Sequence, residues 1–144
     1  GDVVIGTQTA HHDVDVTAFG YAIGHVPRMP ARFESDPALC AAAEKAAAAF
    51  EHAAVHRGLI VSGDQFVHSS ESVAEVRRHF PDAQAVEMEA AAIAQSCHRF
   101  GVPFVVVRAI SDLADEEADT SFETFLKTAS VHSAKMVLQL IEAL

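Results

Sequence analysis

The segment from Arg108 to Asp112 places a cation and a carboxylate at the end of a long apolar run. If that run is a buried strand, the arginine needs an acceptor, because a buried guanidinium is rarely left unpaired. The carboxylate of Asp112 follows the run directly, where it is well placed to meet a ligand. Aspartate also commonly begins a turn by accepting backbone hydrogen bonds. The segment therefore predicts a ligand-contacting acid, with a turn residue as the alternative.

Two carboxylates, Glu87 and Glu89, flank Met88 where an apolar segment passes into a helical pattern. An ionised carboxylate can accept hydrogen bonds from two adjacent hydroxyl groups, so one of the pair could bind a polyol. Acidic residues in the first turn of a helix also stabilise the helix dipole without any ligand. Met88 suits adaptable contact with a ligand, although core packing is the commoner use of a lone methionine.

Two further segments carry candidate ligand-contacting side chains. Residues 62–67 include Phe66, which could stack on a planar base or fill the core. Residues 11–15 hold four side chains able to ligate a metal, but neighbouring residues of an extended chain point in different directions, and no second Cys and His cluster exists. We expect no metal. The sequence also lacks the glycine-rich dinucleotide motif, the P-loop and the serine-hydrolase motif, so we expect no cofactor.

The candidate segments lie at the ends of alternating predicted strands and helices. Strands are expected at 2–10, 55–62, 85–88 and 103–110, and helices at 38–52, 70–80, 89–100 and 120–144. The run 103–110 is typical of a central parallel strand covered on both faces. The alternation predicts an α/β fold with a mostly parallel central sheet and helices on both faces. Ligands of such sheets bind beyond the carboxyl ends of the strands.

Local signals define several boundaries. The stretch Ser35-Asp36-Pro37 supplies an N-cap candidate and predicts a helix start, and Gly101 predicts a helix end. The pattern Thr120-x-x-Glu123 predicts a capping box for the last helix. Residues 16–33 are interrupted by glycines and prolines, and a loop of this length in a compact domain is usually functional.

Composition excludes several classes of protein. Ten Lys and Arg residues against twenty Asp and Glu residues give a net charge of −10, which disfavours nucleic-acid and acidic-membrane partners. The apolar runs are far shorter than a membrane span. Cys40 and Cys97 lie in helical stretches and suggest no disulfide framework, so we expect a reducing compartment, the cytoplasm. The length of 144 residues predicts one domain.

Four stretches together resemble the 5′-methylthioadenosine/S-adenosylhomocysteine nucleosidase family of the purine nucleoside phosphorylase-like fold. They are 13–21, 57–64, 86–90 and 104–112, and the resemblance covers essentially all 144 residues. A large N-terminal part of the family has no counterpart in this chain, including the glutamate that activates the attacking water. We therefore expect residues 1–144 to form one nucleosidase-like α/β domain that is incomplete at its N-terminus and inactive alone.

The resemblance implies hydrolysis of the N-ribosidic bond of methylthioadenosine and adenosylhomocysteine, releasing adenine and a 5-thio-substituted ribose. It implies that Asp112 is the catalytic acid, which protonates the purine. It gives substrate-binding roles to Phe66, Val67, Glu87, Met88, Glu89, Arg108, Ser111 and Phe122. It also implies a homodimer, in which Val16, Phe19 and Pro27 reach the partner's thio pocket.

Two other functions stay open from the sequence. The chain could belong to another nucleoside phosphorylase or nucleosidase of the same fold. A phosphorylase would require phosphate, which separates it from the methylthioadenosine nucleosidase. A non-catalytic adenosine-binding module would release no adenine.

Overall fold

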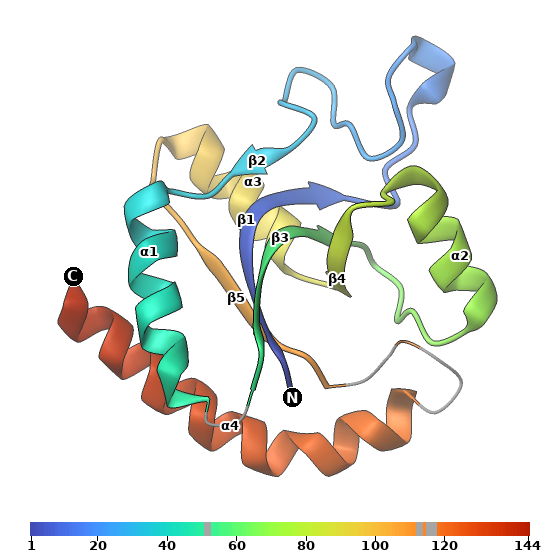
Figure 1. The fold of residues 1–144 in the computed structure, drawn as a ribbon. Coiled ribbons are helices and arrows are strands. Elements are labelled where there is room, and N and C mark those ends of the chain that lie inside the picture. The colour runs from blue at the N-terminus through green and yellow to red at the C-terminus, as the bar shows by residue number, and fades with distance from the viewer. Residues whose placement is uncertain (51–52, 112–113, 115–117) are drawn as a thin grey trace.

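The computed structural model describes residues 1–50, 53–111, 114 and 118–144 (Figure 1). In chain order its elements are β1 (Val3–His11), the 3-10 turn η1 (Thr17–Phe19), β2 (Phe33–Glu34), α1 (Pro37–Ala46), the 3-10 turn η2 (Ala47–Ala49), β3 (Val55–Ser62), α2 (Ser70–His79), β4 (Ala83–Glu87), α3 (Ala90–Phe100), β5 (Val106–Ala109) and α4 (Ala118–Ala143). The predicted α/β fold class is confirmed. No helix among these elements is long and apolar enough to cross a membrane.

One five-stranded sheet forms the centre of the molecule. β1 pairs in parallel with β3, and β3 pairs in parallel with β4. β2 and β5 both pair antiparallel with β1, so the sheet is mixed. In the parallel part, His11 lies opposite Ser62, and Ser62 lies opposite Glu87. The carboxyl ends of β1, β3 and β4 therefore meet at one edge of the sheet.

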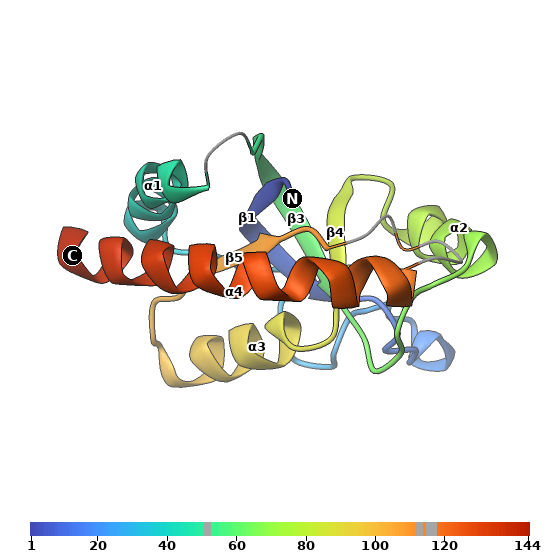
Figure 2. The ribbon, with the colours of Figure 1, turned by 90° about the horizontal axis from the view of Figure 1, so that it is seen from below.

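Helices cover both faces of this sheet, and Figure 2 shows α1 and α3 on opposite sides of it. Val3 and Ile5 of β1 pack against α1 and α4, whereas Val4 between them packs with Ile60 against the start of α3. All four side chains are at most 2% exposed. This alternation follows from the two-residue period of a strand, and each such burial contributes about 1.5–3 kcal/mol.

The prediction of a central parallel strand at 103–110 is wrong. Only Val106–Ala109 form β5, which pairs antiparallel with β1 and whose residues are all half-buried. The most buried strands are β1 and the second half of β3. An apolar β-branched run indicates a shielded strand, but it does not specify the direction or the neighbours of that strand.

Two of the predicted helix boundaries hold. Asp36 caps α1, with its Oδ2 accepting the N–H of Leu39 at 3.0 Å, and Pro37 is the first helical residue. Gly101 ends α3 with a φ of 67°. The predicted capping box at Thr120 is wrong, because α4 already begins at Ala118. The helix predicted to run from 38 to 52 is α only to Ala46, after which η2 follows; its predicted end lies outside the described residues.

Candidate functional site

The candidate site lies where β1, β3 and β4 end, beside the first residues of α3 (Figure 1). Ser62, the last residue of β3, is 3% exposed. Its hydroxyl donates to the carboxylate of Glu87 and accepts the N–H of Ala91 at 2.8 Å. A single serine thus connects β3, β4 and α3.

The carboxylate of Glu87 is surrounded by hydrogen-bond donors. It accepts the N–H of Ala90 at 3.0 Å on Oε1 and 2.9 Å on Oε2, and the N–H of Glu89 at 3.2 Å. The hydroxyl of Ser62 and the guanidinium of Arg108 also donate to it. Four donor groups match the roughly four lone-pair sites of a carboxylate. The side chain of Glu87 is only 12% exposed.

Glu89 has a different environment, although it lies only two residues further along the chain. Its side chain is 62% exposed, and its Oε1 lies 3.9 Å from the guanidinium of Arg108. Met88 between the two glutamates is 44% exposed, so it is not a core residue. Glu89 is therefore the carboxylate of the pair that is open to a ligand, with a cation beside it.

His11, the last residue of β1, and His12, which follows it, have different surroundings. The Nε2 of His11 is hydrogen-bonded to Oε1 of Gln95 at 2.8 Å. Burial lowers the pKa of His12, which holds this imidazole neutral at neutral pH. Asp13 accepts the N–H of Asp64 at 2.8 Å. Within the part of the chain that the structure describes, no group of three His, Cys, Asp or Glu side chains could hold a metal ion.

Gly63, just after β3, leaves room for the side chains of His12 and Asp13 at this edge of the sheet. A Cβ on that residue would lie 2.4 Å from Nε2 of His12 and 2.9 Å from Cγ of Asp13. Real Cβ atoms do not approach other atoms so closely, so only glycine fits here without a shift of its neighbours.

The aromatic candidate Phe66 is 45% exposed and stacks on His68, with ring centroids 5.7 Å apart and planes inclined by 25°. Val67, the next residue, is 7% exposed. Phe66 is thus not a core residue, and part of its ring remains exposed beside the end of β3.

The structure places the other predicted site residues in three ways. Ser111 is half-buried just after β5. Asp112 lies outside the described residues, and Phe122 lies within α4, where only the backbone is described. Val16, Phe19 and Pro27 lie on the loop between β1 and β2, which Figure 1 shows projecting beyond the end of β1. Phe19 at η1 is 81% exposed, so this loop residue is not part of the cluster around Glu87.

Ser62 was not among the predicted site residues, although it ends the predicted strand 55–62. A polar residue at the end of an apolar strand is the sequence signal that could have identified it. Its partner Glu87 is set by the parallel pairing of β3 and β4.

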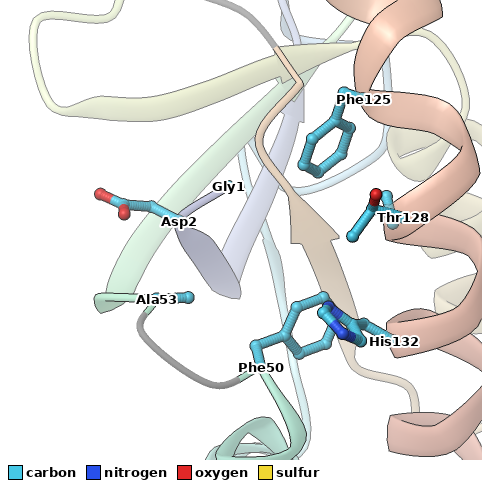
Figure 3. A pocket seen from close by; sticks show the side chains of 8 residues that line it. Gly1, Asp2, Phe50, Ala53, Phe125, Thr128 and His132 are labelled. Carbon is cyan, nitrogen blue, oxygen red and sulfur yellow. The ribbon is translucent and has the colours of Figure 1, made fainter.

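A pocket of about 230 Å³ lies away from these residues, at the start of β1 (Figure 3). It is lined by Gly1, Asp2, Phe50, Ala53, Phe125, Thr128, Ala129 and His132. It shares no residue with the cluster at the carboxyl ends of the strands.

Comparison with known proteins identifies the family. A protein of Anoxybacillus flavithermus named 5′-methylthioadenosine/S-adenosylhomocysteine nucleosidase is 56% identical over 144 residues, which are 100% of this chain and 62% of the relative. A nucleosidase of the same name from Neisseria meningitidis has a crystal structure in complex with methylthio-immucillin-A. Its sequence is 68% identical to this chain, and the two structures superpose with a TM-score of 0.94. The match covers 99% of this chain and 62% of the Neisseria chain.

An S-adenosylhomocysteine nucleosidase from Streptococcus pyogenes, solved in complex with 5-methylthiotubericidin, is 39% identical with a TM-score of 0.92 and covers 100% of this chain and 61% of its own. The chain thus spans about 62% of the length of the curated relative described above. Residues 1–142 match the family model described as "Phosphorylase superfamily". Because that match extends over nearly the whole sequence, the chain belongs to the phosphorylase superfamily.

Proposed function

We propose that this protein hydrolyses the N-ribosidic bond of 5′-methylthioadenosine and S-adenosylhomocysteine, releasing adenine and a 5-thio-substituted ribose. The proposal rests chiefly on one observation, the open carboxylate of Glu89 beside Arg108 at the strand ends. An exposed carboxylate there suits the paired hydroxyls of a ribose. The 68% identity to a nucleosidase solved with a methylthio nucleoside analogue supports this choice of ligand.

The reaction needs an acid near the purine. Adenine is a poor leaving group as an anion, so protonating it while positive charge develops on the ribose stabilises an oxocarbenium-like transition state. We assign the acid to Asp112, which follows β5 and Ser111 in the sequence. Arg108 and Ser111 support the acid and the attacking water.

The remaining contacts divide between the base and the sugar. Phe66 stacks on the purine, and the backbone of Val67 contacts its Watson–Crick edge. Glu89 accepts the ribose hydroxyls, and Met88 packs on the sugar. Phe122 forms one wall of the alkylthio pocket. The partial exposure of Phe66, Met88 and Glu89 supports these roles, because a ligand contact requires accessible atoms.

We also propose a homodimer in which Val16, Phe19 and Pro27 complete the partner's thio pocket. The exposed Phe19 at the tip of a projecting loop supports this proposal. The free cysteines Cys40 and Cys97 fit a reducing compartment, and we place the protein in the cytoplasm.

The test is release of adenine from methylthioadenosine, with and without inorganic phosphate, by residues 1–144 combined with the N-terminal part of a relative, because residues 1–144 alone are expected to be inactive. We expect release that does not depend on phosphate. A strict requirement for phosphate, with a ribose phosphate as co-product, would instead identify a nucleoside phosphorylase. Binding of the nucleoside with no adenine release under either condition would identify a non-catalytic binding module.

A further inference from the structure

Glu87 ends β4 and Glu89 immediately precedes α3. The two carboxylates are only two residues apart, but their surroundings differ. Glu87 accepts hydrogen bonds from Ser62, Arg108 and the first amides of α3, and it is only 12% exposed. A carboxylate with this many donors has no remaining lone pair aimed at a ligand. A substrate hydroxyl would have to displace one of those donors, and displacing the 3% exposed hydroxyl of Ser62 would leave a buried donor without an acceptor, which is unfavourable.

We infer that Ser62 and Glu87 are positioning residues, which fix the start of α3 and the guanidinium of Arg108 so that only Glu89 faces the ribose. The inference rests on the proposed function for the identity of the ligand, and it changes the role of Glu87 from substrate contact to support. Glu87 anchors Arg108 through a charge-assisted hydrogen bond. Arg108 in turn lies 3.9 Å from the Glu89 carboxylate, so its position sets the electrostatic surroundings of the ligand contact.

Ser62 supports this arrangement from the side of β3. Its hydroxyl uses both of its functions, donating to Glu87 and accepting the N–H of Ala91. That amide belongs to the first turn of α3, where backbone N–H groups have no partner within the helix. Without the hydroxyl, a buried amide loses its acceptor and Glu87 loses one donor. Because Ser62 is 3% exposed, water cannot readily replace either contact.

The experiment compares Glu87→Gln with Glu89→Gln in this 144-residue chain. Amide hydrogen exchange at Ala90 and the nitrogen NMR signal of the Arg108 guanidinium report on positioning. Calorimetric affinities for methylthioadenosine and for adenine report on the ribose contact. We expect Glu87→Gln to speed exchange at Ala90 by about tenfold or more and to shift the Arg108 signal, because hydrogen bonds to a charged acceptor are lost. Both variants should weaken methylthioadenosine binding by about tenfold while the affinity for adenine stays nearly constant.

The second pair of variants isolates the hydroxyl of Ser62. Ser62→Ala should speed exchange at Ala91 by about tenfold, and Ser62→Thr, which keeps a hydroxyl, should restore slow exchange. The matched control is Ser96→Ala. Ser96 lies on the same helix and donates to the carbonyl of Ala92 at 3.0 Å, but it is exposed and remote from Glu87. This control should change neither exchange at the start of α3 nor the affinity for either ligand.

The outcomes separate this inference from the proposed function. If Glu87→Gln weakens methylthioadenosine binding while the exchange rates and the Arg108 signal stay unchanged, Glu87 contacts the substrate and the inference is wrong. Unchanged exchange in both Glu87→Gln and Ser62→Ala also overturns it. If the unmodified chain binds neither methylthioadenosine nor adenine, the proposed function fails, while exchange at Ala90 and Ala91 still decides the positioning roles.

Discussion

At the scale of single residues, the acid Asp112 is the most sensitive point of the proposed reaction. We expect Asp112→Asn to lower adenine release by about 10² to 10⁴ in rate, because a general acid acts mainly in the transition state. Nucleoside binding should weaken much less. The measurement is the turnover rate and the methylthioadenosine affinity of the variant, made in a form of the protein that shows turnover. A variant with nearly full turnover would remove Asp112 from the mechanism.

The half-buried imidazole of His12 gives a pH dependence to folding. Burial lowers its pKa in the folded state below the ordinary value of 6.5. As the pH falls below about 6.5, the unfolded chain binds a proton at this residue before the folded chain does, so the free energy of unfolding decreases. The lowered pKa values of Asp2, Asp15 and Asp82 act in the same direction, but only below about pH 3.8. Between these two pH values the contribution of His12 can be measured separately.

We therefore expect the unmodified chain to lose more stability between pH 7 and pH 5 than the variant His12→Gln. The measurement is urea denaturation of both chains at each pH. Differences between the two chains cancel the contributions of the other histidines. Parallel curves for the two chains would show that His12 is not responsible.

The residues of the site could be predicted only in part from the sequence. The segments after the strands were identified, because polar residues interrupt apolar runs at 62–67, 87–89 and 108–112. The different roles of Glu87 and Glu89 could not be predicted, because both suit the first turn of a helix. The difference arises from Ser62 and Arg108, which lie far away in sequence and meet Glu87 only through strand pairing.

At the scale of elements, the loop between β1 and β2 is fixed at two places. Gly24 donates its N–H to the carbonyl of Val14 at 2.7 Å and has a φ of 86°. Further along, the guanidinium of Arg32 binds both carboxylate oxygens of Asp82 at 2.6 and 3.1 Å. Phe19 lies between Val14 and Gly24, so the hydrogen bond between these two residues closes the base of the segment that carries the exposed ring.

Two glycines of this loop allow a matched test of the first anchor. Gly20 and Gly24 have nearly equal φ values of 87° and 86°, but a Cβ at Gly20 meets nothing within 4 Å, whereas one at Gly24 would lie 2.1 Å from the carbonyl oxygen of His11. Gly20→Ala should cost about 1–2 kcal/mol, the cost of a left-handed conformation for an L-residue. Gly24→Ala should cost clearly more, because β1 or the loop must also shift. Denaturation curves measure both costs, and equal losses would contradict this account of the anchor.

The elements themselves show which signals carry information. Helix starts and ends with a local physical cause, such as the N-cap predicted within Ser35-Asp36-Pro37 and the helix end at Gly101, were predicted correctly. The strand 55–62 was predicted with its observed bounds. The direction of β5 was not, because it is set by pairing with β1, about a hundred residues earlier in the chain, and no local pattern reports such a pairing.

At the scale of the whole molecule, large apolar side chains remain exposed on several elements. On α4 and just after it, Val131, Val137, Leu138, Ile141 and Leu144 are between 46% and 74% exposed. Phe19 on the loop and Phe100 at the end of α3 are also exposed. These exposed apolar side chains favour association between copies of the chain. The net charge of −10 opposes the approach of two copies. Association should therefore tighten when salt screens this repulsion.

The last prediction separates general association from the proposed role of Phe19. Phe19 and Phe100 are both 81% exposed, but Phe19 lies on the projecting loop and Phe100 lies at the end of α3. We expect the chain to sediment as a dimer and Phe19→Ala to weaken methylthioadenosine binding more than adenine binding, because this ring completes the thio pocket of the other copy. Phe100→Ala removes the same ring from an equally exposed position, so it should leave the affinities for both ligands unchanged. Sedimentation together with calorimetry tests all three chains. A stable monomer with full affinity for methylthioadenosine, or equal effects of the two substitutions, would show that Phe19 does not act across a dimer interface.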